Sequence, residues 1–265
     1  MYSDLQTAKT QTMKLALSLS LLLVFLFVLG RVTSAWAQSK ELNPKTPLTL
    51  KTPCAAETQR VEIALHRGPR AKTVRAPRGS SKRDAPLLDR DASWLRAQLS
   101  EANRLFAQIG VCFWMRDDAP ISLAESAPKT RAQRTRLGRV KGRTARGRVD
   151  LFIVNRLGDV DLVGEEIRGV HWRDPRDRKR LRWILLSRIA RPLVLAHELG
   201  HYFGLPHSAY PESIMNKRSR RHPPREARGF VKRELKIMRR RWRAMLKSGQ
   251  LKSGQLKESI SKPPR

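Results

Sequence analysis

The chain is short of acidic residues. Among its 265 residues, 55 are Lys or Arg and only 23 are Asp or Glu, which gives a formal net charge of +32. Aromatic residues make up 6% of the chain and are not interleaved with the basic runs, and no nucleic-acid-binding motif is present. Base recognition is therefore unsupported. The positive charge is compatible with binding to a polyanion or an anionic surface. The charge is explained equally well if Arg is simply the ordinary solvated residue of surface loops.

The chain also lacks an apolar run long enough to span a bilayer. Its longest run, residues 15–29, is shorter than the about 20 residues that a membrane-crossing helix needs. The run follows Lys14 and is followed by small residues that end in Ala35-Trp36-Ala37, which is the pattern of a cleavable signal peptide. We therefore expect cleavage after Ala37 and a secreted or periplasmic protein without a stable membrane span. An uncleaved anchor is the alternative.

One short segment points to chemistry. Residues 197–207 read HELGHYFGLPH. His197 and His201 are four residues apart, so on a helix both imidazoles can reach one metal ion. Gly204 allows the chain to turn sharply and to bring His207 back as a third ligand. Three protein ligands and an open fourth position are typical of a single catalytic Zn²⁺, with Glu198 placed as general base.

The extended motif is similar to the zinc-binding consensus of the metzincin metallopeptidases. That clan also has a Met-turn beneath the histidines, and Ser213-Ile214-Met215-Asn216 follows the third His by a few residues. The short interval and the sequence of residues 205–208, LPHS, look most like the matrixin branch. The chain departs from that branch after Met215, where Asn216-Lys217 replaces a proline-containing turn, and no tyrosine stands where astacins have a ligand.

The resemblance implies a fold and a mechanism. The fold is α+β, a mixed twisted sheet over an active-site helix, followed by the Met-turn and a C-terminal helix. The three histidines would hold zinc, Glu198 would move a proton between the attacking water and the leaving amine, and Met215 would pack beneath the site. The substrate would be a protein or peptide, paired with an antiparallel edge strand for which residues 168–172 are the candidate.

The two cysteines, Cys54 and Cys112, fit an oxidising compartment. Each precedes or opens a predicted strand, and in the metzincin fold these two strands are parallel neighbours, so the resemblance implies a disulfide between them. The alternative is that Cys54 acts as an inhibitory zinc ligand, as in a matrixin propeptide. The residues around it, Thr52-Pro53-Cys54-Ala55-Ala56, do not resemble that switch motif.

Hydrophobic periodicity places the elements along the chain. It predicts strands at 60–65, 111–115 and 149–154, a helix at 94–109 ended by Gly110, and a hairpin of 170–172 with 183–186. Residues 67–91 are expected to form a loop, and residues 125–148 a mobile surface loop. A C-terminal helix with apolar residues from Phe230 to Met245 either docks under the Met-turn or lies on a membrane surface. The predicted parts of the chain are a signal peptide (1–37), a short propeptide or linker (38–54), a catalytic domain (55–247) and a basic low-complexity tail with nothing to bury (248–265).

Three further side chains near the motif have ordinary explanations. His171 on the edge strand could contact zinc or substrate, but such a histidine is more often neither. Tyr202 and Tyr210 could assist catalysis, and aromatic packing is the simpler role for both. A turn with Asp159 and Asp161 resembles a calcium loop only weakly and is better explained as a polar turn.

Two functions from different classes remain open. One is a secreted zinc endopeptidase of the metzincin type. The other is a cationic protein that binds a polyanion or the cell envelope and keeps zinc without catalysis. Glu198 discriminates between these two functions, because an inactivated metzincin most easily loses the general base while it keeps the histidines. In this chain Glu198 is present, which favours the enzyme. A hydrolase acting on a non-peptide bond would use the same ligands.

Overall fold

The structure is a computed structural model, and it describes residues 48–55, 57–69, 87–174, 176–177, 181–217 and 223–254. The predicted signal peptide and most of the predicted propeptide lie outside these residues. Within the described part of the chain, none of the helices has the length and apolar character needed to cross a membrane.

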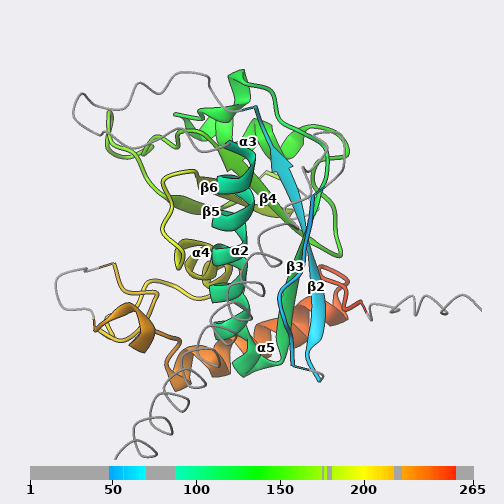
Figure 1. Cartoon of the computed structure of the whole chain (residues 1–265), viewed down its shortest axis with the longest axis vertical. Coiled ribbons are helices and arrows are strands. Elements are labelled where there is room, and N and C mark those ends of the chain that lie inside the picture. The colour runs from blue at the N-terminus through cyan, green and yellow to red at the C-terminus, as the bar shows by residue number, and fades with distance from the viewer. Residues whose placement is uncertain are drawn as a thin grey trace, which may run out of the picture. The chain divides into compact units, whose positions relative to one another are not determined.

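Six strands form one mixed sheet in the order β1-β3-β2-β4-β6-β5 (Figure 1). The four inner strands are parallel to one another, and β1 and β5 join antiparallel at the two edges. The predicted hairpin and antiparallel edge strand are therefore present. The strands are β1 (Thr49–Leu50), β2 (Gln59–Arg67), β3 (Val111–Asp117), β4 (Val149–Val154), β5 (Gly169–Arg173) and β6 (Arg182–Ser187).

The α-helices are α2 (Leu87–Phe106), α3 (Arg131–Arg139), α4 (Val194–Tyr202) and α5 (Lys232–Lys247). Single 3₁₀ turns are η1 (Ala107–Ile109), η2 (Ala124–Ser126) and η4 (Arg225–Ala227). The helix predicted at 94–109 begins earlier, at Leu87, than its apolar residues indicate. Asp91, in its first turns, is buried by an ion pair with Arg188, which is 97 residues away in the chain. Its end at Gly110 is as predicted, and this glycine has a φ of 73°.

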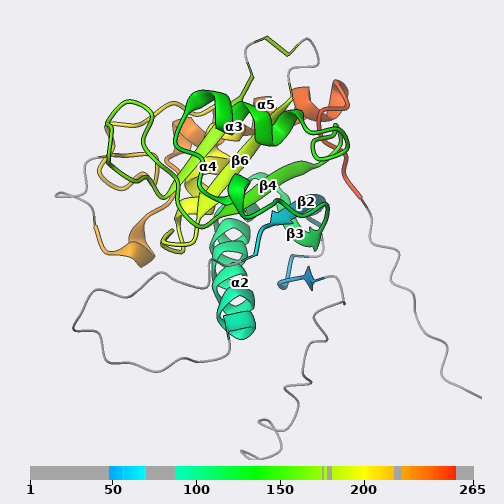
Figure 2. The same ribbon diagram turned by 90° about the horizontal axis from the view of Figure 1, so that it is seen from above.

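Both faces of the sheet are covered. Along β4, Leu151 and Ile153 belong to one hydrophobic cluster, and Phe152 and Val154 belong to the other, as the period-two alternation of a strand requires. The larger cluster lies under α2, α4 and α5, and the smaller one includes Leu137 of α3. Figure 2 shows α2 and α3 on either side of β4. The α+β fold predicted from the sequence is confirmed.

Helix α3 corrects the prediction of a mobile loop at 125–148. Thr130 and Gln133 form a capping box that starts the helix. Arg134 is only 1% exposed, because its guanidinium donates to the carbonyl of Gly158 at 2.5 Å and lies 5.1 Å from the centre of the Trp172 ring. The prediction was wrong because it took every arginine of this segment as solvated, whereas this one is buried by tertiary contacts.

The N-terminal edge of the sheet includes residues ahead of the predicted domain boundary at 55. Strand β1 pairs with β3, and Leu50 is buried in the larger core cluster. Cys54 lies between β1 and β2 and forms a disulfide with Cys112 of β3, with the two Cα atoms 6.0 Å apart. The bond joins the segment that enters β2 to the neighbouring parallel strand, as the resemblance implied.

The C-terminal part of the chain packs on the same core. Met238, Trp242 and Met245 of α5 are buried, so the helix docks on the protein, as the first of the two interpretations predicted. The expectation that the following repeat has nothing to bury is wrong for Leu251. Leu251 is 1% exposed and bridges to Gly147, because the repeat returns alongside the sheet.

Candidate metal centre

Helix α4 presents two histidines on one side and a core face on the other. Leu195, Ala196 and Leu199 are buried in the larger core cluster, which fixes the rotation of the helix. His197 and His201 are half-buried on the opposite side, one turn apart. Packing of the apolar face therefore decides where the two imidazoles point.

Three imidazoles meet at one point. The Nε2 atom of His201 lies 3.1 Å from Nε2 of His197 and 3.2 Å from Nε2 of His207. Of the described residues, these three form the one group of His, Cys, Asp or Glu side chains whose ligand atoms are close enough to hold a common metal ion. His207 is the exposed member, so the group opens to solvent on that side.

Backbone carbonyls set the tautomers of the two helical histidines. Nδ1 of His197 donates to the carbonyl of Ile214 at 2.7 Å, and Nδ1 of His201 donates to the carbonyl of Leu205 at 2.7 Å. A neutral imidazole that donates from Nδ1 has its lone pair on Nε2. Burial lowers the pKa of His197 and of His207 to about 4, and it also lowers the pKa of His201. Three neutral nitrogens with converging lone pairs fit a zinc ion.

The third histidine is brought back by a turn at Gly204. This residue has a φ of 90°, a backbone conformation that side chains disfavour. The N–H of Gly204 donates to the carbonyl of His201 and the N–H of Leu205 donates to that of Gly200, which ends the helix. His207 then follows on the returning chain.

The Met-turn lies against the middle of α4. Met215 is fully buried, and its sulfur would be only 2.6 Å from a Cβ placed at Gly200. A glycine in the helix interior thus lets the turn approach closely. The carbonyl of Ile214, next to Met215, orients His197. The turn therefore acts on the site through packing and through one backbone hydrogen bond.

A buried pair that the sequence analysis missed fastens this turn to α5. The hydroxyl of Ser213 donates to the carboxylate of Glu234, at 2.8 Å from Oε1, and accepts from the N–H of Met215. The same carboxylate accepts the N–H of Val231 and so caps α5. A glutamate three residues into a predicted helix was the one sequence signal for this role.

Glu198 lies beside the histidines and is 6% exposed. Its Oε2 accepts the backbone N–H of His171 on β5 at 2.7 Å. Burial raises the pKa of Glu198 to about 8, although this hydrogen bond acts in the other direction. Gly169 makes the approach of β5 possible, because a Cβ there would lie 2.8 Å from Val194 and 3.0 Å from Glu198. A glycine inside a strand pattern was the sequence signal for this close approach.

The side chains of the other three candidates do not join the metal group. The ring of His171 packs edge-on against Tyr202, with ring centres 5.6 Å apart, and its contribution near the site is its backbone N–H. Tyr202 is buried, as predicted. Tyr210 is 44% exposed and lies in the loop that precedes the Met-turn.

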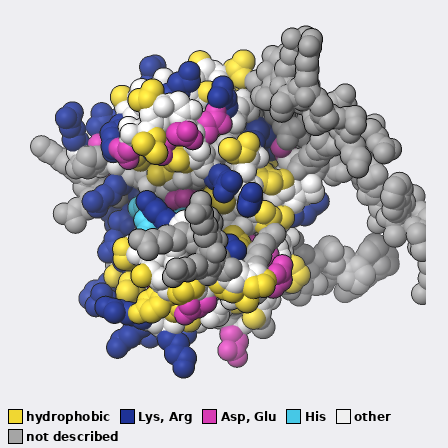
Figure 3. All heavy atoms as spheres, turned by 90° about the vertical axis from the view of Figure 1, so that its left-hand side faces the viewer, with side chains coloured by type: hydrophobic (Ala, Val, Ile, Leu, Met, Phe, Trp, Pro, Cys, Tyr) yellow, Lys and Arg dark blue, Asp and Glu magenta, His cyan; other side chains and the backbone are white. Residues whose placement is uncertain are grey.

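Positive charge surrounds the site. Lys217, which stands where matrixins have a proline-containing turn, is close enough to lower the pKa of all three histidines. The charge of the buried Arg134 also acts on Glu198 and favours its charged form. Figure 3 shows histidine at one place on this face, with Lys and Arg side chains beside it.

Asp159 makes a polar turn, accepting the N–H of Asp161, as predicted.

Four features together define a metallopeptidase of the metzincin type. They are a mixed sheet with an antiparallel edge strand, a helix with two histidines, a third histidine after a glycine turn, and a methionine beneath them. The model of the matrixin peptidase family matches residues 81–228, which is more than half of the chain. The chain therefore belongs to the matrixin family, whose members are zinc metallopeptidases.

Two solved structures are similar at low identity. One is archaemetzincin from Methanopyrus kandleri, with 16% identity over 71% of this chain and 98% of that one and a TM-score of 0.41. The other is a chaperone–substrate complex, with 14% identity over 71% of this chain and 38% of that one and a TM-score of 0.40. Both scores are below 0.5, so neither likeness bears on function. No curated protein matches the sequence.

Proposed function

We propose that the protein is an exported zinc endopeptidase in which Glu198 is the general base. The observation that carries the proposal is the convergence of three neutral Nε2 atoms beside a buried carboxylate. His197, His201 and His207 would hold the ion. Bound zinc supplies Lewis acidity at the open side of the three imidazoles.

The chain's own groups account for the proton transfer. Oε2 of Glu198 is held by the N–H of His171, which leaves Oε1 to take a proton from the attacking water. In its ionised form, which the charges of Arg134 and Lys217 favour, this carboxylate would accept that proton and return it to the leaving amine nitrogen. The hydrogen bond to β5 keeps the carboxylate in one position while it does so.

The edge strand supports a peptide as the substrate. Strand β5 pairs with β6 on one side and is the last strand of the described sheet. An extended peptide can pair with the free edge of such a strand through main-chain hydrogen bonds. Because β5 also holds Glu198, a peptide on this edge would lie next to the proposed base. Pairing in mid-chain favours cleavage within a peptide over removal of terminal residues.

Export is supported by the N-terminal sequence, with Lys14, the apolar run and Ala35-Trp36-Ala37. N-terminal sequencing of protein recovered outside the cytoplasm should begin at Gln38. Recovery of an intact N-terminus on a membrane fraction would instead support an uncleaved anchor.

The decisive experiment compares the protein from Gln38 onwards with Glu198→Gln and with Glu212→Gln, an exposed glutamate close to the Met-turn. We would measure zinc by elemental analysis and cleavage of a peptide blocked at both ends. We expect one zinc per chain in all three proteins, and cleavage that only Glu198→Gln and chelation abolish. Zinc without cleavage of any member of a peptide library would refute the enzyme and favour the polyanion-binding alternative.

A further inference from the structure

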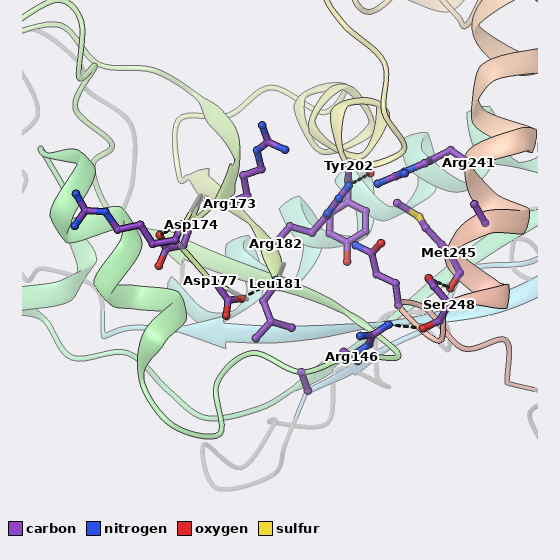
Figure 4. A pocket seen from close by; sticks show the side chains of 14 residues that line it. Arg146, Arg173, Asp174, Asp177, Leu181, Arg182, Tyr202, Arg241, Met245 and Ser248 are labelled. Carbon is purple, nitrogen blue, oxygen red and sulfur yellow. Dashed lines mark hydrogen bonds between the residues drawn. The ribbon is translucent and has the colours of Figure 1, made fainter. Parts of the chain in front are cut away.

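A large cavity lined by arginines lies at the C-terminal end of α4. Its volume is about 960 Å³, and it is enclosed by β5, β6, α5 and the segments that follow each of β5 and α5. Five arginines are among the residues that line it, Arg146, Arg173, Arg176, Arg182 and Arg241, together with Tyr202. Figure 4 shows Arg182 and Arg241 close to Tyr202. The proposed catalytic mechanism makes no use of this cavity.

Arg182 and Arg241 converge on the same end of α4. Nη1 of Arg182 donates to the carbonyl of Tyr202 at 3.1 Å, and its guanidinium carbon lies 5.5 Å from the centre of the Tyr202 ring. Arg241 reaches the same place from α5, past Gly204 (Figure 4). The Nε atoms of both arginines are buried without an acceptor among the described residues. Two half-buried guanidinium groups thus lie close together, and the Nε–H group of each can donate a further hydrogen bond.

Arginines outnumber carboxylates among the residues that line the cavity, five to two. Asp174 pairs with Arg139, outside the cavity, and accepts the N–H of Arg176. Asp177 accepts the N–H of Leu181 at 2.8 Å. Burial lowers the pKa of Arg182, the interaction with Tyr202 acts in the other direction, and the charges of Arg241 and Arg173 lower the pKa further. Positive charge in such a cavity favours the entry of an anion.

The cavity adjoins the proposed catalytic site. Arg173 lies two residues after His171 on β5, about 7 Å along the strand, and the register pairs it with Arg182. The backbone N–H of His171 holds Glu198, and its ring contacts Tyr202 at the cavity. An extended peptide on the free edge of β5 would therefore pass from Glu198 toward Arg173, one of the residues that line the cavity.

We propose that this cavity is a subsite that receives carboxylate side chains of a peptide substrate, so that the enzyme prefers acidic substrates. The proposal rests on the proposed function. The cavity is far larger than an inorganic anion, and one of its lining residues, Arg173, belongs to the proposed peptide-binding strand, which favours a carboxylate carried by a peptide. The guanidinium groups would bind it through charge-assisted hydrogen bonds.

The test measures peptide binding in a Glu198→Gln background, so it does not depend on turnover. The probes are a blocked decapeptide with glutamates near both ends and the same peptide with glutamines, at about 0.15 M salt, where long-range attraction is screened. We expect the glutamate peptide to bind about tenfold more tightly. Arg241→Gln and the exposed Arg173→Gln should each reduce that preference at least about threefold. Arg243→Gln, two residues further along α5 and outside the cavity, should leave it unchanged.

Two outcomes overturn this proposal, and a third bears on the proposed function. An equal loss of preference in Arg243→Gln would show that overall charge is responsible. Inorganic phosphate or free glutamate that binds as tightly as the peptide, and depends on Arg241, would make the cavity a site for free anions. An enzyme that cleaves no peptide but keeps the arginine-dependent preference would refute the proposed function alone.

Discussion

The backbone N–H of His171 donates to Oε2 of Glu198 at 2.7 Å and so joins the edge strand of the sheet to the helix that carries two of the histidines. Residues 27 positions apart in the chain are thereby held in one geometry. The bond fixes one carboxylate oxygen and leaves the other beside the histidines. Gly169 permits it, because a side chain at that position would separate β5 from α4.

Gly169→Ala should impair catalysis without removing zinc. The added Cβ would lie 2.8 Å from Val194 and 3.0 Å from Glu198, so β5 or the carboxylate must shift. We expect kcat to fall by about tenfold or more, and the free energy of unfolding to fall by about 1–3 kcal/mol. Peptide cleavage, zinc content and urea unfolding check this. Gly254→Ala is the control, because its Cβ would meet open space. Unchanged activity of Gly169→Ala would contradict the positioning role.

Ser213→Ala should destabilise the Met-turn. The change removes a donor from the buried carboxylate of Glu234 and an acceptor from the N–H of Met215. Leaving such groups unsatisfied costs about 1–3 kcal/mol in the free energy of unfolding. Ser248→Ala, at an exposed hydroxyl, should cost less than about 0.5 kcal/mol. Equal midpoints of urea unfolding for the two variants would argue against the buried pair.

The stability that Glu125 contributes should depend on pH. Arg143 holds its carboxylate with two hydrogen bonds, of 2.7 and 3.1 Å, and these bonds lower the pKa from 4.5 to about 2. Since the folded pKa is the lower one, the stabilisation is complete above 4.5 and is lost as the pH falls toward 2. Allowing for solvent screening, we expect Glu125→Gln to cost about 1–2 kcal/mol at pH 7. The difference from the wild type should shrink at pH 3. A difference that stays constant over this range would exclude the ion pair as its cause.

Removing the disulfide should lower stability without changing the sheet. Cys54 and Cys112 are 58 residues apart, and a cross-link that closes a loop of this size restricts the unfolded chain. We expect the double variant Cys54→Ala, Cys112→Ala to lose about 2–4 kcal/mol in the free energy of unfolding. Guanidinium unfolding with and without reductant checks this, because reductant should destabilise the wild type alone. A wild type insensitive to reductant would show that the bond is absent in solution.

The sequence by itself determined the metal-binding segment and most of the strands. Ligand spacing is local, so His197, His201, Gly204 and His207 can be identified from eleven consecutive residues. Strand and helix positions follow from apolar periodicity. This signal fails where a residue is buried by tertiary contacts and not as part of an apolar stripe. Arg134 in α3 is buried through Trp172 and Gly158, and no periodic pattern indicates such a contact.

Only the tertiary structure decided how the site is held and what surrounds it. The carbonyls of Ile214 and Leu205 set the tautomers of two histidines, β5 fixes Glu198, and α5 fastens the Met-turn through Ser213. The arginine cavity likewise joins residues of β5, β6 and α5 that are far apart in the sequence. Backbone groups and arginines occur throughout the chain, so their partners are specified by packing and cannot be read from local sequence.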